Sequence, residues 1–177
     1  MLRFVTGNEG KLREAREYLD QVEGVEYDYP EIQADDLETI AAYGARDAYE
    51  NVGSPVLVDD AGLFIDALSG FPGPFSAYVE DTLGIERVAE LARQEENHRA
   101  RFRAAVAYCD GERTETFDGS VRGRIVPPRG EGGFGYDPIF EHNDRTFAEM
   151  NPEEKNAVSH RGRALGSFSA WYRERSK

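Results

Sequence analysis

Acidic side chains follow two of the expected strands, in positions that could hold a metal ion. The run Val56–Val58 predicts a buried strand that leads directly into Asp59 and Asp60, and Glu31 follows Pro30 at the end of another strand. Ligands of open α/β sheets bind beyond the carboxyl ends of the strands, so these acids could converge there. Carboxylates from separate strands suit Mg²⁺, which takes oxygen ligands and keeps several waters. A solvated turn is the alternative.

A second candidate is a strand–turn–helix junction near the N-terminus, with the composition of an anion-binding loop. The expected strand Leu2–Val5 ends at this junction. Backbone N–H groups at the start of a helix can hold an anion, and Gly7 lets the backbone approach it closely. Thr6 and Asn8 add side-chain donors, and Lys11 adds a positive charge. The spacing matches neither the Walker A loop nor the dinucleotide fingerprint.

A third candidate is the glycine-rich segment Gly132–Pro138, which alternates glycines with two aromatic residues. Three glycines weaken an ordinary strand. The segment could instead present Phe134 and Tyr136 to a flat ligand, with Asp137 as an acceptor. Stacking on a base contributes about 1–3 kcal/mol. A hairpin whose aromatic residues fill the core is the alternative.

A fourth candidate combines two helix starts close together in the sequence. Asn151 begins one helix, and Ser159 is expected to cap the next. His160 and Arg161 then lie in the first turn of the second helix, where positive charge opposes the helix dipole. Lys155 lies between the two starts. The unfavourable placement points to a ligand, and a solvated helix start is the alternative.

The elements that must position these candidates follow from the hydrophobic periodicity. The order of strands and helices, with long alternating runs in the middle, predicts an α/β fold. We expect a single domain, residues 1–177, with a mixed, elongated sheet flanked by helices and two lobes around a central cleft. The expected helices are Lys11–Asp20, Leu37–Asn51, Ile85–Arg93 and one that follows Ser159. The expected strands are Leu2–Val5, Val25–Tyr29, Val56–Val58, Arg101–Cys109 and Thr116–Val126.

Composition and charge exclude several classes of protein. The chain carries 21 basic and 34 acidic residues and a net charge of -13, which disfavours a nucleic-acid binder. No apolar run approaches the about 20 residues that span a membrane. The single cysteine argues against a disulfide framework. We expect a cytoplasmic protein without a targeting segment. Only three lysines among the basic residues, on so acidic a chain, suggest adaptation to a salt-rich cytoplasm.

Taken together, the motifs resemble those of the Ham1-like family, the inosine/xanthosine triphosphate pyrophosphatases. They occur in the family's order and span nearly the whole chain. The matching segments are Phe4–Asn8 with Lys11, Val58–Leu63, Gly70–Pro74, Phe134–Pro138, and Glu154–Asn156 with Ser159–Arg161.

The resemblance implies that the chain hydrolyses non-standard purine nucleoside triphosphates to the monophosphate and pyrophosphate. It also implies Mg²⁺ dependence and a homodimer. By position, Asp60 would be the catalytic residue and would share the metal ion with Glu31. The backbone of Ala61 would contact the substrate, although many members carry Ser or Thr there. The triphosphate would be bound by Thr6, Gly7, Asn8, Glu9, Gly10 and Lys11. The base pocket would be lined by Phe134, Gly135, Tyr136, Asp137, Lys155, His160 and Arg161.

Two other functions remain open at this point. One is a pyrophosphatase that acts on pyrimidine or other modified nucleoside triphosphates on a related fold. The other is a nucleotide sensor without catalytic activity, which would need only the pocket. Adjacent acids placed to bind a metal favour an enzyme over a sensor.

Overall fold

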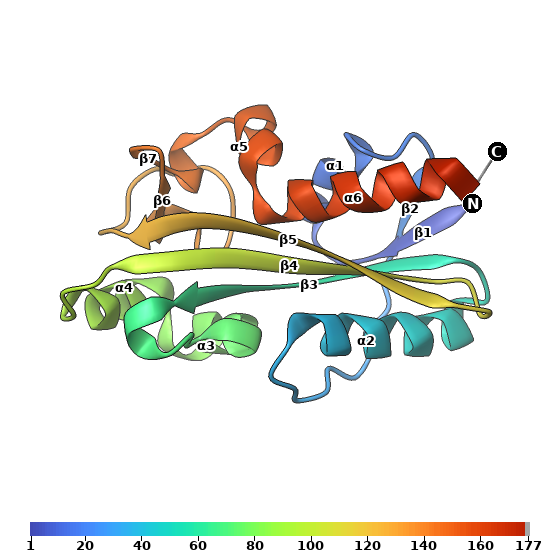
Figure 1. The fold of residues 1–177 in the computed structure, drawn as a ribbon, viewed down its shortest axis with the longest axis horizontal. Helices are drawn as coiled ribbons and strands as arrows, with labels where there is room; N and C mark the ends of the chain where they lie inside the picture. The colour runs from blue at the N-terminus through green and yellow to red at the C-terminus, as the bar shows by residue number, and fades with distance from the viewer. Residues whose placement is uncertain (176–177) are drawn as a thin grey trace. The chain divides into compact units, whose positions relative to one another are not determined.

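The computed structural model describes residues 1–175, and its central feature is a mixed sheet (Figure 1). Within these residues the sheet has seven strands in the order β2-β1-β3-β4-β5-β6-β7. The strands at the β1 side pair in parallel, and those at the β7 side pair antiparallel. The bounds are β1 Leu2–Val5, β2 Val22–Val25, β3 Val56–Ile65, β4 Arg99–Cys109, β5 Thr114–Ile125, β6 Phe140–His142 and β7 Arg145–Thr146.

Helices flank the sheet, which confirms the predicted α/β class. The helix α2 begins at a side-chain cap, because Asp36 Oδ1 accepts a hydrogen bond from Thr39 N at 2.7 Å. It ends at Gly53, whose φ of 69° is the left-handed conformation that glycine adopts easily. The α-helices of residues 1–175 are α1 Glu9–Arg16, α2 Leu37–Val52, α3 Ser76–Leu83, α4 Ile85–Arg93, α5 Pro152–Val158 and α6 His160–Arg175.

The chain divides into two compact units, which are described separately below. Unit 1 contains residues 1–60, 104–119 and 160–177, and unit 2 contains residues 61–103 and 120–159. Strands β3, β4 and β5 each contribute residues to both units.

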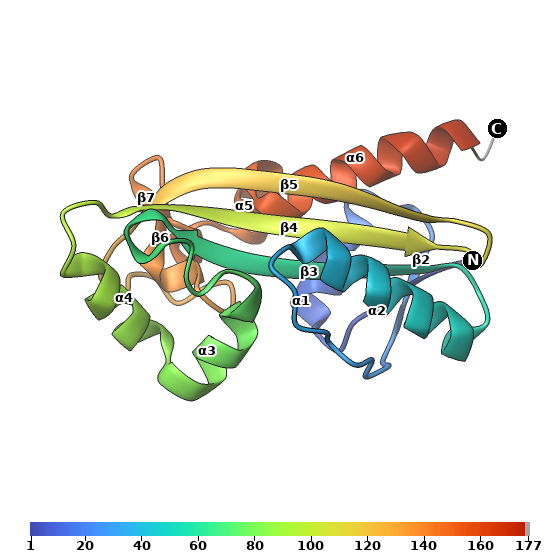
Figure 2. The ribbon, with the colours of Figure 1, turned by 60° about the horizontal axis from the view of Figure 1, so that its bottom comes forward.

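In unit 1, helices α2 and α6 lie on opposite faces of the strands (Figures 1 and 2). Residues Leu2 to Val5 of β1 pair in parallel with Val22 to Val25 of β2. Apolar side chains of β1, β3 and α2 are fully or almost fully buried, including Phe4, Leu37 and Leu57. This core fixes the ends of β1 and the first half of β3.

Unit 2 has its own hydrophobic core beneath helices α3 and α4. It gathers aliphatic side chains from β3, β4 and β5 and several aromatic rings. The rings of Phe102, Phe140 and Phe147 pack together, with centroids 4.5 to 5.7 Å apart. The core side chains of β4 and β5 alternate with residues that point to the other face of the sheet.

Most predicted elements are confirmed to within two residues at each end, and three differ by more than that. The helix expected at Lys11–Asp20 is α1, which begins earlier, at Glu9, because Asn8 caps it. The strand expected at Val25–Tyr29 was largely wrong, because it shares only Val25 with β2, whose residues Val22 to Val25 are the ones that pair with β1. The strand expected at Val56–Val58 continues as β3 to Ile65, whose side chain is fully buried in the core of unit 2.

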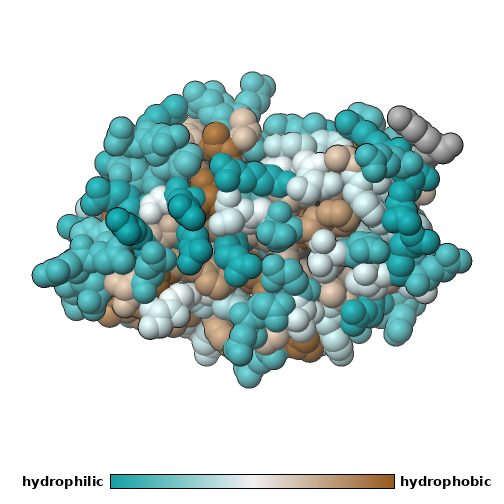
Figure 3. Space-filling model, in the orientation of Figure 1, coloured by the Kyte–Doolittle hydropathy of each residue, from teal (hydrophilic) through white to brown (hydrophobic). Residues whose placement is uncertain are grey.

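The glycine- and proline-rich stretch after β3 contains a short 3-10 helix, Gly73–Phe75, and leads into α3, which the sequence pattern does not predict. The face of the molecule in Figure 3 is mainly hydrophilic, with apolar residues in small patches. None of the helices in residues 1–175 is long and apolar enough to cross a membrane.

Candidate active site

The predicted anion-binding loop connects β1 to α1 in unit 1. Asn8 caps the helix, since its Oδ1 accepts hydrogen bonds from Gly10 N at 2.8 Å and Lys11 N at 3.2 Å. The hydroxyl oxygen of Thr6 accepts a hydrogen bond from Asn8 N at 3.0 Å. The loop is thus held in one conformation by its own polar side chains.

These contacts change which groups of the loop can bind an anion. The backbone N–H groups of Gly10 and Lys11, expected to be donors, already donate to Asn8. The side-chain Nδ2 of Asn8 and the ammonium of Lys11 are the donors that capping does not use, because Asn8 accepts through its Oδ1. The Lys11 side chain is 25% exposed.

A buried network of charges connects this loop to β3 and α6. Lys11 Nζ lies 2.9 Å from Asp59 Oδ1, and Arg161 Nε donates to Asp59 Oδ2 at 2.6 Å. Arg161 Nη1 in turn donates to Glu14 Oε2 on α1 at 2.9 Å. The side chains of Asp59 and Arg161 are 1% and 3% exposed. Burial at this depth requires that each charge be paired, as it is here.

The network sets the charge states of its members. Burial by itself raises the pKa of Asp59, but the positive charges of Arg161 and Lys11 outweigh it and hold that pKa well below its ordinary value. Burial lowers the pKa of Arg161, and the charges of Asp59 and Glu14 more than compensate, so its pKa is raised. Both groups therefore stay ionised at neutral pH.

Asp60 has a different environment from its neighbour, although the two are adjacent. Both acids lie within β3, not at the end of a strand as the sequence suggested, so their side chains point to opposite faces. Asp59 is buried and Asp60 is only half-buried. The acid that holds Lys11 in place is therefore not the one expected to do the chemistry.

Glu31 and Asp60 both lie close enough to Tyr29 for their charges to act on its hydroxyl group. Burial raises the pKa of the Tyr29 phenol, and the negative charges of Asp59, Glu31 and Asp60 raise it further. The Tyr29 ring lies against Gly44 of α2, where any side chain would overlap it. Packing on α2 thus positions the segment that carries Glu31.

The carboxylates of this neighbourhood fit a divalent cation that is only partly held by protein. Within residues 1–175, no group of three or more His, Cys, Asp or Glu side chains is arranged to hold a metal ion. Mg²⁺ binds to proteins through one or two carboxylates, and waters and substrate phosphates complete its coordination. The half-buried carboxylate of Asp60 and the exposed one of Glu31 fit that kind of site.

In unit 2 the predicted base-binding residues form a second cluster. Lys155 Nζ lies 2.6 Å from Asp137 Oδ2 and 4.1 Å from the centroid of the Phe134 ring. Asp137 Oδ2 also accepts a hydrogen bond from Phe134 N at 3.0 Å. The side chain of Lys155 is only 5% exposed. The carboxylate thus holds both the lysine and the start of the loop.

The two aromatic residues of this loop have different surroundings. Tyr136 is buried in the core of unit 2, and its hydroxyl donates to the backbone oxygen of Ser76 at 2.7 Å. The Tyr136 ring thus contributes to the core of unit 2, and its contact with a ligand stays a prediction. Phe134 is half-buried, with Lys155 over one face of its ring. Gly135, between them, has a φ of 61°.

The remaining predicted residues lie at the start of α6 or on β3. His160 and Arg161 are both buried in unit 1, where Gly119 of β5 lies so close to the His160 backbone that no side chain would fit. Ala61 follows Asp60 on β3 and is half-buried. The structure brings Thr6, Asn8, Lys11 and Arg161 together in unit 1, and Phe134, Asp137 and Lys155 together in unit 2.

Two residues of the site were missed by the sequence reasoning. Glu14 binds Arg161, and the available signal was an acid directly beside the buried Ala15 on α1. Glu80, on α3, lies about 3.4 Å from where a side chain of Gly135 would begin. Burial raises the pKa of Glu80, and the charges of Asp81 and Asp137 raise it further. Nothing in the local pattern marks Glu80.

The fold and these clusters define an α/β protein with a lysine-bearing strand–turn–helix loop beside two adjacent carboxylates, a combination suited to binding and cleaving a phosphate chain. Comparison with known families agrees with that class. The chain belongs to the Ham1 family, whose model matches residues 2–171.

Individual relatives resemble the chain over almost its full length. A dITP/XTP pyrophosphatase of Methanopyrus kandleri is 56% identical over 96% of this chain and 95% of its own. A dITP/XTP pyrophosphatase of Thermococcus kodakarensis is 51% identical over 99% of each chain. Among solved structures, a HAM1 protein from Coxiella burnetii superposes with a TM-score of 0.87 at 34% identity, covering 98% of both chains.

Proposed function

We propose that the protein hydrolyses non-standard purine nucleoside triphosphates, namely ITP, dITP and XTP, to the monophosphate and pyrophosphate. It would thereby remove these nucleotides from the pool used for nucleic-acid synthesis. Family membership and the dITP/XTP activity named for relatives support this activity. The observation that carries it is the pair Asp59 and Asp60, in which one acid anchors Lys11 and leaves its neighbour for chemistry.

The phosphate chain would bind at the loop between β1 and α1. The Lys11 ammonium, oriented by Asp59, would bind a phosphate oxygen, and the Asn8 amide would donate to another. A divalent metal ion accompanies the substrate in nucleotide pyrophosphatases of this kind. Here we propose Mg²⁺ on Asp60 and Glu31, where it would neutralise phosphate charge and acidify a bound water.

The bond that breaks joins the α-phosphorus to the oxygen that bridges it to the β-phosphorus. A water oxygen adds to the α-phosphorus and releases a proton to the solvent, and that bridging oxygen leaves with the β- and γ-phosphates as pyrophosphate. Asp60 would chiefly orient this water by accepting its hydrogen bond. Asp59, charged and paired, has no proton to exchange at that pH.

Base selection would depend on donors that match a 6-keto group. Inosine and xanthosine carry an oxygen acceptor at C6, where adenine carries an amino donor. Phe134 would stack on the base, while His160 and Lys155 would supply N–H donors. A site built to hydrogen-bond a group can reject its absence by about 10⁴-fold. We therefore propose ITP and XTP far above ATP, with GTP intermediate or low.

The test of the proposed function is pyrophosphate release from a panel of nucleoside triphosphates, with and without Mg²⁺. The panel contains ITP, dITP, XTP, GTP, ATP and the pyrimidine triphosphates. Metal-dependent release from ITP and XTP is the expected result. Preferential turnover of pyrimidine nucleotides would identify the other enzyme activity, and binding of ITP without turnover would identify a sensor.

Replacing His160 by alanine is expected to raise the KM for ITP by about tenfold, the value of one buried hydrogen bond. The KM for ATP should change less, because adenine offers no acceptor at C6. Arg161 is not suited to the same test, because its substitution would remove an ion-pair partner from the buried carboxylates of Asp59 and Glu14. Steady-state kinetics with both nucleotides give the answer, with His98→Ala as a matched control in unit 2. Equal rises for ITP and ATP would remove His160 from base recognition.

The location, assembly and salt response are further parts of the proposal. We propose that the protein is a cytoplasmic homodimer. The molar mass from light scattering tests the oligomeric state. No binding to nucleic acid or membranes is proposed.

Raising the salt concentration is expected to stabilise the protein. Between about 0.1 M and about 1 M salt, the screening length falls from about 10 Å to about 3 Å, which weakens repulsion among the acidic residues. The net charge of -13 makes that repulsion strong at low salt. The measurement is the melting temperature in a KCl series. A flat or falling trend would contradict adaptation to a salt-rich cytoplasm.

A further inference from the structure

A face of the sheet in unit 2 carries five arginines that the proposed reaction does not use. On β4 and β5, the core residues Ala100, Phe102, Val121 and Ile125 point into the hydrophobic core. The alternating side chains point the opposite way. We call this set the arginine face: Arg99, Arg101, Arg103, Arg122 and Arg124.

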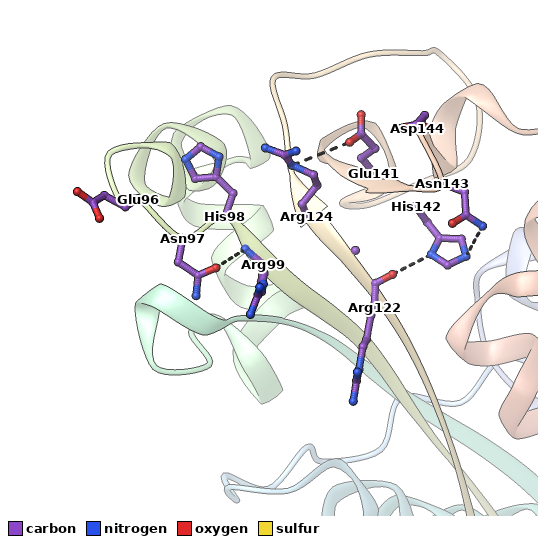
Figure 4. A pocket seen from close by; sticks show the side chains of 11 residues that line it. Glu96, Asn97, His98, Arg99, Arg122, Arg124, Glu141, His142, Asn143 and Asp144 are labelled. Carbon is purple, nitrogen blue, oxygen red and sulfur yellow. Dashed lines mark hydrogen bonds and ion pairs between the residues drawn. The ribbon is translucent and has the colours of Figure 1, made fainter.

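The arginine face lines two neighbouring hollows of the surface. The larger has a volume of about 1020 Å³, and Figure 4 shows Arg99, Arg122 and Arg124 among the side chains that line it, together with His98 and His142. A second hollow of about 650 Å³ shares Arg99 and Arg122 with the first. Ligand sites commonly have volumes of about 300–1000 Å³. The two shared arginines therefore stand where the hollows meet.

Two of the five arginines on this face lack a carboxylate partner within residues 1–175, whereas Arg101 lies 3.9 Å from Asp66 at the second hollow. The guanidinium groups of Arg99 and Arg122 have no carboxylate within ion-pair distance in that part of the chain. Arg124 is 4.0 Å from Glu141, but Glu141 is already bound by Arg129 at 2.6 Å. Like charges held side by side repel one another, and a bound anion would relieve that repulsion.

Acidic residues at the rim do not neutralise the two shared arginines. Glu96 lines the larger hollow, but Figure 4 shows its side chain pointing away from the other labelled side chains. Asp144 lies in the tight turn between β6 and β7, where its φ is 64°. His142 is fixed on the strand, with its Nδ1 2.8 Å from the backbone oxygen of Arg122. The hollow thus combines side chains of β4 and β5 with space for a ligand beside Arg99 and Arg122.

We propose that the arginine face binds a small, multivalent phosphate anion of the pyrophosphate kind, through Arg99 and Arg122 where the two hollows meet. Guanidinium groups pair with phosphate oxygens through two parallel hydrogen bonds. A net charge of -13 disfavours long polyanions such as nucleic acids, while a compact anion meets mainly the local field. This inference does not depend on the proposed hydrolase activity.

The probe is inorganic pyrophosphate, titrated calorimetrically without divalent cations. The variant Arg99→Gln/Arg122→Gln is compared with Arg87→Gln/Arg93→Gln, which removes the same charge from exposed positions on α4. Lys11→Gln serves to weaken binding at the loop of unit 1. We expect the Arg99/Arg122 variant to lose about tenfold or more in affinity, and the α4 control and Lys11→Gln to retain this binding.

The outcomes separate the proposal from its competitors. The proposal would be overturned if Lys11→Gln lost all pyrophosphate binding while the Arg99/Arg122 variant kept its full affinity. A changed oligomeric state of the Arg99/Arg122 variant, with unchanged affinity, would overturn it in favour of an interface between copies. Titration with ADP distinguishes the source of the phosphate: equal or tighter binding of ADP supports a nucleotide, and weaker binding supports the free anion.

Discussion

Replacing Asp60 by asparagine is expected to abolish pyrophosphate release while leaving the fold intact. The asparagine would keep the size of the side chain but lose the negative charge that orients water and holds Mg²⁺. Loss of the group that positions the attacking water is expected to lower turnover by about 10²–10⁴-fold. Asp60 is half-buried on β3, so its substitution removes no large part of the core. The measurement is kcat for ITP at saturating Mg²⁺.

A matched control makes this result specific. Asp118→Asn removes the same charge from an exposed position on β5 and should leave kcat unchanged. Circular dichroism and the melting temperature should be nearly the same for both variants and the parent. If Asp60→Asn kept normal turnover, the catalytic role would belong to another residue.

Replacing the neighbouring Asp59 by asparagine is expected to destabilise the protein strongly. Asp59 is the shared partner of Lys11 and Arg161, at 2.9 and 2.6 Å. Without that carboxylate, the buried Arg161 would keep its ion pair with Glu14 but lose its shorter one. Breaking a buried ion pair costs about 3–5 kcal/mol. For a chain of this size, that lowers the melting temperature on the order of 10 °C.

The pH dependence of that loss has a definite sign. Because the folded-state pKa of Asp59 lies below the unfolded value of about 3.9, its charge stabilises the fold above that pH. The stabilisation is lost as pH falls from about 3.9 towards the lower folded-state pKa. The stability difference between the parent and Asp59→Asn should thus be constant from neutral pH down to about 5 and shrink below about 4. Chemical denaturation across this range measures it.

A different combination of stability and activity in these variants would exchange the roles of Asp59 and Asp60. If Asp59→Asn were as stable as the parent but inactive, Asp59 would act in catalysis and the buried network would contribute little. Comparing both variants for stability and turnover separates the two roles, because the substitutions have the same chemistry at adjacent positions.

Local sequence patterns predicted the elements in which apolar residues repeat at a regular period along the chain. The helix Ile85–Arg93 and the strand Leu2–Val5 have the predicted bounds. The long alternating runs of β4 and β5 were found within two residues at each end. In each case the pattern of apolar residues repeats with the period of the element, so neighbours along the chain carry enough information.

Bounds set by a partner strand or cap were less predictable. β2 covers Val22–Val25, the residues that pair with the four residues of β1, although the alternating pattern that predicted a strand lies at Val25–Tyr29. β3 continues through Asp59 and Asp60 because Leu63 and Ile65 reach the core of unit 2. Two adjacent acids look like the end of a strand when only the local sequence is considered.

By itself, the sequence determined the class of fold, the family and the segments that could carry chemistry, because residue types and spacing are local properties. Only the tertiary structure decided which of two adjacent side chains is buried in an ion pair and which is left accessible. Burial beside Lys11 and Arg161 commits Asp59 to a charge network, whereas the opposite face of the same strand leaves Asp60 half-buried near Tyr29. Likewise, Tyr136 belongs to the core and Phe134 to a charged cluster, although both belong to one short motif. Partners distant in sequence create these differences, since burial and pairing energies depend on what packs against a side chain.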